Sequence, residues 1–78
     1  MYLWSVSLLV VEVNGYKIES YADLRRANLG GTNLSGASLE AAKLSNANLT
    51  GANLTDADLT DTDLTDANLS NAKLCRPE

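Results

Sequence analysis

The sequence predicts a superhelical solenoid, and three observations support this prediction. The chain has 78 residues, which is enough for one small domain only. From residue 22 onward a leucine recurs every fifth residue without interruption, and two residues before each leucine stands alanine or threonine. The eleven leucines are Leu24, Leu29, Leu34, Leu39, Leu44, Leu49, Leu54, Leu59, Leu64, Leu69 and Leu74.

A five-residue period fits neither regular secondary structure. On an α-helix, successive leucines would lie about 140° apart and form no stripe. On a flat strand, the odd spacing would alternate them between the two faces. A superhelix whose faces each use five residues places every leucine inside, with the small residue two positions earlier, and leaves three polar positions outside. The alternative is low-complexity disorder, which the uninterrupted leucine period argues against.

Residues 22–76 resemble the pentapeptide-repeat proteins, whose hallmark is A-[DN]-L-x-x in tandem. The resemblance implies an all-β fold, namely a right-handed quadrilateral β-helix with four pentapeptides in each coil. Eleven repeats would then make about 2.75 coils, with residues twenty apart stacked at about 4.8 Å. This chain uses leucine in every repeat, whereas the family often has phenylalanine there, so we expect a uniform and narrow core.

The stacking that the resemblance implies also arranges the outer side chains in columns. In one column Lys43 would lie between Asp23 and Asp63. Because an exposed ion pair contributes only about 0–1 kcal/mol, we interpret these columns as devices for register and solubility. Another column would hold three amides that can hydrogen-bond along the axis, those of Asn28, Asn48 and Asn68.

The segment 1–21 does not follow the repeat, so we divide the chain into this segment, the repeats at 22–76 and a tail at 77–78. Asn14-Gly15 between β-forming residues is a strong hairpin signal. The alternative is a degenerate coil, because Leu3, Leu8, Val13 and Ile18 are also five residues apart, but Tyr16 and Tyr21 would then occupy small interior positions. We favour the hairpin, which predicts three cross-strand pairs: Val13 with Tyr16, Glu12 with Lys17 as a charge pair, and Val11 with Ile18.

The start of the chain and the end of the repeats are the candidate contact surfaces. The apolar start could be a cap on the first coil, or an arm that pairs with another subunit, and both interpretations stay open. Pro77 stops strand pairing after the last repeat, so we expect an open coil end that invites association. The candidate contact residues are Tyr2, Leu3, Trp4, Val6, Leu8, Leu9, Val10 and Leu74.

The composition argues against enzymatic chemistry. The chain has no histidine and a single cysteine, Cys75, which excludes an internal disulfide, the usual zinc ligand sets and every imidazole-based triad. Serine and threonine are abundant but lack a base, and a core filled by leucine and alanine leaves no substrate pocket. We therefore expect no catalysis, no cofactor and no small-molecule substrate.

The formal net charge of −4 argues against direct binding to nucleic acid. Aspartates are concentrated in one stretch without a basic residue among them. This acidic belt lacks the glycine and the terminal glutamate of a calcium-binding loop, so we interpret it as a solvated surface and expect no metal. The acidic belt consists of Asp56, Asp58, Asp61, Asp63 and Asp66.

These observations predict a non-enzymatic structural or protein-interaction module that self-associates as a homo-oligomer. The longest apolar stretch, 2–13, is too short to span a bilayer, and no signal peptide is evident, so we expect a cytoplasmic protein without a membrane partner. The lead-in at 14–19 is similar to that of small bacterial and phage members of the family, which suggests a phage-encoded or virion-associated role. The alternative that the resemblance implies is an acidic DNA mimic that binds DNA gyrase or topoisomerase.

Overall fold

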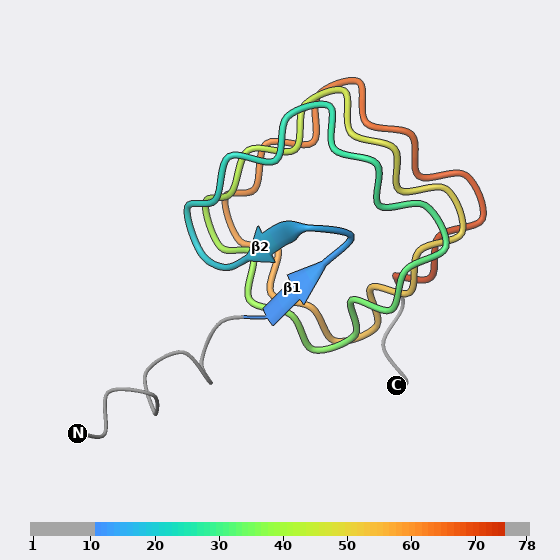
Figure 1. Ribbon diagram of the computed structural model, residues 1–78, viewed down its shortest axis with the longest axis horizontal. Coiled ribbons are helices and arrows are strands. Elements are labelled where there is room, and N and C mark those ends of the chain that lie inside the picture. Colours follow the sequence, from blue (N-terminus) through green and yellow to red (C-terminus); the bar gives the residue numbers. More distant parts are fainter. Residues whose placement is uncertain (1–10, 75–78) are drawn as a thin grey trace.

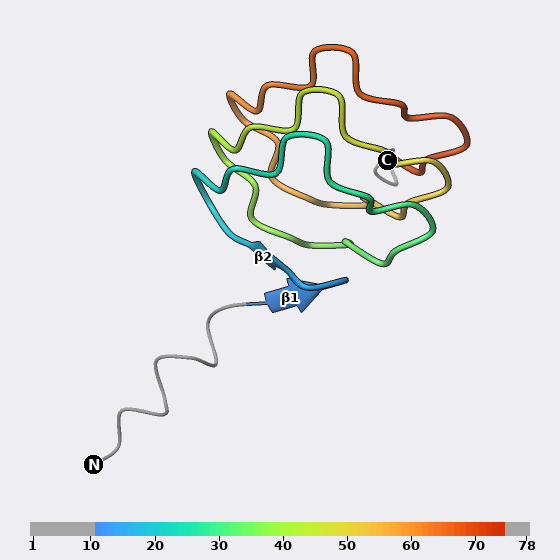
Figure 2. The same ribbon diagram turned by 45° about the horizontal axis from the view of Figure 1, so that its top comes forward.

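The computed structural model describes residues 11–74, which form a stack of coils with a short hairpin at one end (Figure 1). The hairpin consists of β1 (Val11–Val13) and β2 (Tyr16–Ile18) in antiparallel pairing. Beyond β2 the chain winds repeatedly around a common axis, and successive coils lie over one another (Figure 2). The described residues therefore form a β-helix, as the family resemblance implies.

Successive coils are joined by parallel pairing between residues twenty apart, which confirms the predicted stacking. Leu29 N donates to Asn48 O at 2.8 Å, and Asn48 N donates back to Ala27 O at 2.8 Å. Each side of a coil contributes one such bridge, so the sheets of the solenoid are built from single bridges. The bridges join Asp23 with Lys43, Asn28 with Asn48, Asn33 with Asn53, Ser38 with Asp58, Lys43 with Asp63, Asn48 with Asn68 and Asn53 with Lys73.

A turn with a left-handed residue ends each side of the coil. In the turn after Leu24, Ala27 N donates to Leu24 O at 3.1 Å, and Arg26, the third residue of the turn, has φ 62°. A positive φ at this position is the requirement of a type II turn, which glycine, asparagine and aspartate meet at least cost. This explains why those residue types dominate at the second position after leucine, where Arg26 and Ala41 are the exceptions. The others are Gly31, Gly36, Asn46, Gly51, Asp56, Asp61, Asp66 and Asn71.

The interior is filled by the leucines and by the small residues that precede them. Leu29, Leu39, Leu44 and Leu49 have no exposed surface. Leucines twenty residues apart stack along the axis and form leucine ladders. Burying one such side chain contributes about 1.5–3 kcal/mol, so these ladders are the main source of stability. Where threonine replaces alanine, its hydroxyl donates a hydrogen bond to a backbone carbonyl, as Thr32 Oγ1 does to Leu29 O at 2.7 Å.

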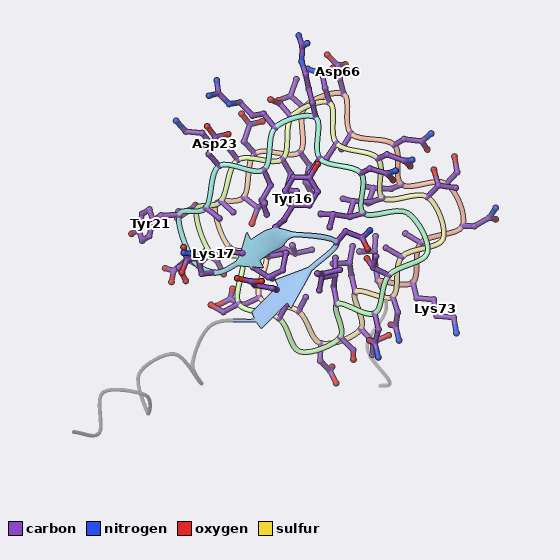
Figure 3. All side chains as sticks on the ribbon, viewed as in Figure 1. Tyr16, Lys17, Tyr21, Asp23, Asp66 and Lys73 are labelled. Carbon is purple, nitrogen blue, oxygen red and sulfur yellow. The ribbon has the colours of Figure 1, made fainter. Side chains whose placement is uncertain are left out.

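The hairpin has the predicted register, with Val11 opposite Ile18, Glu12 opposite Lys17, and Val13 opposite Tyr16. The degenerate-coil alternative is wrong at Tyr21, which is 74% exposed and points away from the coils (Figure 3). The expected charge pair between Glu12 and Lys17 is also wrong, because within residues 11–74 only Arg25 and Asp23 form an ion pair. Both side chains of the hairpin pair are exposed, where hydration competes with ion pairing.

Core position should determine how much each leucine stabilises the fold. We expect Leu49→Ala to lower the free energy of unfolding by about 2–5 kcal/mol, because it opens a cavity between two coils. Leu69→Ala should cost clearly less, since Leu69 is already partly exposed. Urea denaturation followed by circular dichroism measures both, and equal losses would contradict a stacked core that ends in an open coil.

The left-handed turn position offers a second test, at Gly36. This glycine has φ +71°, and a Cβ added to it would meet no atom within 4 Å. Gly36→Ala should therefore destabilise through backbone strain alone, by about 1 kcal/mol. Gly36→Asn is the matched control and should cost less, because asparagine tolerates the left-handed region. A difference between their thermal midpoints checks this, and a more stable alanine variant would contradict it.

Candidate interaction site at the open coil

The hairpin covers the N-terminal end of the solenoid. Ile18 is 4% exposed, and Val13 and Tyr16 pack against the same core (Figure 3). The turn is fixed to the first coil, since Asn14 Nδ2 donates to Asn28 O at 3.1 Å. At the equivalent positions of later coils, Asn48 O and Asn68 O accept from leucine N–H groups of the preceding coil. Asn14 takes the place of that donor for the first coil. The hairpin is thus a cap, whereas the candidate residues Tyr2, Leu3, Trp4, Val6, Leu8, Leu9 and Val10 lie outside the described residues.

The opposite end of the solenoid is open within residues 11–74. Leu59, Leu64 and Leu69, in the last coil, are partly exposed, whereas the leucines stacked against them from the preceding coil are buried. Leu74, the predicted contact residue, is 45% exposed. Apolar side chains that would be covered in the middle of the stack are therefore accessible to a partner here.

The backbone of this coil edge also has unused hydrogen-bonding groups. In the preceding coils the N–H of each leucine and of each left-handed residue donates to the next coil, as with Leu44 N to Asp63 O and Asn46 N to Thr65 O. Among the described residues, the equivalent N–H groups of Leu64, Asp66 and Leu69 have no backbone acceptor. The open end is therefore an unpaired β-edge around an apolar centre, which is a template for pairing with another chain.

The acidic belt occupies residues 56–66 of the last coil, and three of its members serve the turns. Asp56, Asp61 and Asp66 occupy the left-handed position, with φ of 62°, 58° and 58°. Asp66 points outward from the coil (Figure 3). The belt carries five carboxylates, and the only cation at 55–74 is Lys73. This one coil therefore has a charge of −4, as large as the formal net charge of the whole chain.

The other two members of the belt accept hydrogen bonds from the turn that follows them. Asp63 Oδ1 accepts from Thr65 N at 3.0 Å and from Thr65 Oγ1 at 2.6 Å. Asp58 Oδ1 accepts from Thr60 N at 3.1 Å. Hydrogen bonding from these threonines lowers the pKa of both carboxyl groups, because it favours the charged form. Asparagine makes the same bond in other repeats, at Asn28, Asn33, Asn48, Asn53 and Asn68.

The belt does not continue along the axis as an acidic column. Asp63 stacks on Lys43 and Asp58 stacks on Ser38. The predicted column of Asp23, Lys43 and Asp63 is present, and Lys43 contributes to the lowered pKa of both aspartates. Within the described range, no group of three acidic or cysteine side chains is arranged to hold a metal ion.

The asparagine column forms in part. Asn48 Nδ2 donates to Asn28 Oδ1 at 3.3 Å, and no such bond is found between Asn48 and Asn68 in the part of the chain that the structure describes. Each Oδ1 in this column, that of Asn28 included, accepts a backbone N–H two residues further on, which fixes the turn. Local turn geometry therefore takes precedence over contacts between coils.

A second charged cluster lies at the side of the first two coils. Arg25 forms a bidentate pair with Asp23, with Nε–Oδ1 of 2.8 Å and Nη2–Oδ2 of 2.7 Å. This pair lowers the pKa of Asp23 to about 2. It borders a shallow hollow with Arg26, Ser45 and Asn46. Since both partners are more than half exposed and already satisfy each other, the cluster is a solvated surface.

Comparison with known proteins decides the family. The family model described as pentapeptide repeats matches eight copies over residues 20–56 and 42–76. The chain belongs to the pentapeptide repeat family. Pentapeptide repeat proteins are generally non-enzymatic structural repeat proteins, and their repeats often take part in protein interactions. The resemblance deduced from A-[DN]-L-x-x is thereby confirmed.

One solved structure similar to this pentapeptide repeat chain is the crystal structure of a pentapeptide repeat protein (Rfr23) from the cyanobacterium Cyanothece 51142. The two are 34% identical, with a TM-score of 0.36. The match covers 72% of this chain and 46% of that one, so this chain spans less than half of the other protein's length. The search of curated proteins gave no match. Within residues 11–74, no helix is long and apolar enough to cross a membrane.

The sequence reasoning missed the side-chain bonds that hold the turns. In most repeats an aspartate or asparagine precedes the leucine, and a serine, threonine or glycine follows it. This spacing places a side-chain oxygen two residues before the N–H that it accepts, which is the pattern of an Asx-turn. The signal was therefore present in the same five letters that revealed the repeat.

The two threonine-bonded carboxylates should make the fold sensitive to acid. Their pKa values are below the ordinary 3.8, so they stabilise the folded state fully above about pH 4 and progressively less as the pH falls through the lowered values. In the double variant Asp58→Asn, Asp63→Asn, the side-chain oxygens can still accept from Thr60 N and Thr65 N, but they no longer titrate. We expect a smaller decrease in melting temperature between pH 7 and pH 3, measured by circular dichroism. An unchanged decrease would contradict this assignment.

Proposed function

We propose that this protein is a non-enzymatic protein-interaction module whose contact surface is the open end of the last coil. The observation that carries this proposal is the difference between the two ends. The hairpin covers one end and bonds to it through Asn14, whereas at the other end Leu74 is exposed. There the N–H groups of Leu64 and Leu69 have no backbone acceptor within residues 11–74. An apolar centre within an unpaired β-edge favours a partner that adds a strand.

The architecture that we propose for this module is a right-handed β-helix of about 2.75 coils with four pentapeptides in each. The pairing of residues twenty apart supports four pentapeptides per coil. A right-handed winding is supported by the strong preference for right-handed crossovers between parallel strands. Such a stack presents its end as a rigid surface, because each buried leucine is held by the coil next to it.

We further propose that the protein self-associates and that this end takes part in the contact. Support comes from the exposed Leu74 and from the apolar composition of residues 1–10, since apolar side chains that lie together favour contact with a partner. A non-enzymatic role is supported by the absence of histidine and by a core that leucine and alanine fill.

The solution mass tests this function. Size-exclusion chromatography with light scattering over a tenfold range of concentration should give a multiple of 8.3 kDa for the native chain. Leu74→Asp should shift the equilibrium toward the monomer, because it places a charge in the apolar contact. Ser70→Asp is the matched control, since it adds the same charge at an exposed position of the same coil and should leave the mass unchanged.

A mass of 8.3 kDa at every concentration would contradict the self-association. Thermal unfolding of Leu74→Asp separates loss of contact from loss of fold. If this variant unfolds at a much lower temperature than Ser70→Asp, its monomeric state does not count as evidence for the interface.

A further inference from the structure

Direct contacts between coil ends are disfavoured on this molecule for two separate reasons. Stacking the open end of one copy on the first coil of another would require displacing the hairpin, which buries Ile18 and bonds Asn14 to the first coil. Stacking two open ends would bring two last coils together, each with a charge of −4 over residues 55–74. Because like charges at close range oppose association, self-association through this end favours a partner surface without negative side chains.

The chain offers one uncharged apolar segment, residues 1–10. It contains no aspartate, glutamate, lysine or arginine, and most of its side chains are β-branched, aromatic or aliphatic. Leu3 and Leu8 are five residues apart, which is the spacing of Leu59, Leu64 and Leu69 in the last coil. Val6 stands two residues before Leu8, in the place that alanine or threonine fills in the repeats.

We propose that residues 1–10 of a second copy of this chain dock along the open edge of the last coil and continue its leucine ladders. Ten residues correspond to two of the five-residue faces of a coil. Leu3 and Leu8 cover partly exposed leucines, while the backbone of the segment pairs with N–H groups such as those of Leu64 and Leu69. This inference rests on the proposed function and names the partner of the same surface.

The geometry of the cap allows this exchange between two molecules. The segment enters the hairpin at Val11, the first residue of β1, and therefore begins at the capped end of its own solenoid. Ten extended residues span up to about 33 Å, which is several times the spacing of about 4.8 Å between coils. A segment of this length can extend beyond its own first coil onto a neighbouring molecule. The acidic belt does not repel this segment, because residues 1–10 carry no negative side chain.

The register of the leucines distinguishes this docking from nonspecific hydrophobic association. Leu8→Ser removes a side chain in the leucine register, and Leu9→Ser removes an identical side chain one position outside it. We expect Leu8→Ser to weaken self-association at least about tenfold and Leu9→Ser to weaken it much less. Light scattering across the same concentration range measures both. Equal effects, or none for Leu8→Ser, would overturn the proposed register.

Mixing two full-length variants tests the pairing itself. Leu8→Ser has an impaired segment and an intact coil end, whereas Leu74→Asp has an intact segment and an impaired end. Each should be monomeric alone, and a 1:1 mixture should give a complex of twice 8.3 kDa and nothing larger. Circular dichroism of each variant alone confirms that both are folded.

The outcomes separate this inference from the proposed function. If the native chain is monomeric at all concentrations, the self-association fails and this inference fails with it. If the native chain associates but the two variants do not complement each other, only the docking of residues 1–10 is overturned. Association of the native chain that strengthens steeply with salt or below pH 4 would also overturn it, because that result indicates direct contact between acidic belts.

Discussion

One backbone conformation determines the rest of this structure, namely a positive φ at the second residue after each leucine from Leu24 to Leu69. It turns the chain at a fixed interval, so every side of the coil holds five residues and every leucine faces the axis. The twenty-residue pairing between coils follows from this regularity. Leucine burial supplies the stabilising free energy, but it can do so only because the turns return the chain to the same place on each coil.

The same conformational requirement is met by neutral and by charged residues. In the first two coils the left-handed position includes Gly31, Gly36 and Gly51, whereas in the last it holds Asp56, Asp61 and Asp66 beside one neutral residue, Asn71. Glycine or asparagine would satisfy these turns equally well without charge. The charge of the last coil is therefore additional to what the fold needs, and it lies beside the end that has no cap. A charged surround limits unspecific pairing of an exposed β-edge.

Much of the fold could be predicted because the decisive signals are local and repeated. Asn14-Gly15 fixes both the turn and the register of the hairpin, and uninterrupted leucine spacing leaves one way to bury the core. The partners of exposed side chains could not be predicted. Glu12 and Lys17 lie opposite each other without an ion pair, while Asp23 pairs with Arg25 rather than with Lys43. Such alternatives differ by less than about 1 kcal/mol, so sequence spacing alone does not select among them.

The five-residue spacing of the buried leucines and the twenty-residue spacing of the outer columns limit how this chain can change in length. An inserted pentapeptide would keep every leucine inside, yet it would shift all later repeats by one face and separate outer neighbours such as Asn28 and Asn48. An insertion of four pentapeptides would add a whole coil and leave each column in place. The interior therefore tolerates growth in steps of five residues, whereas the surface permits it in steps of twenty.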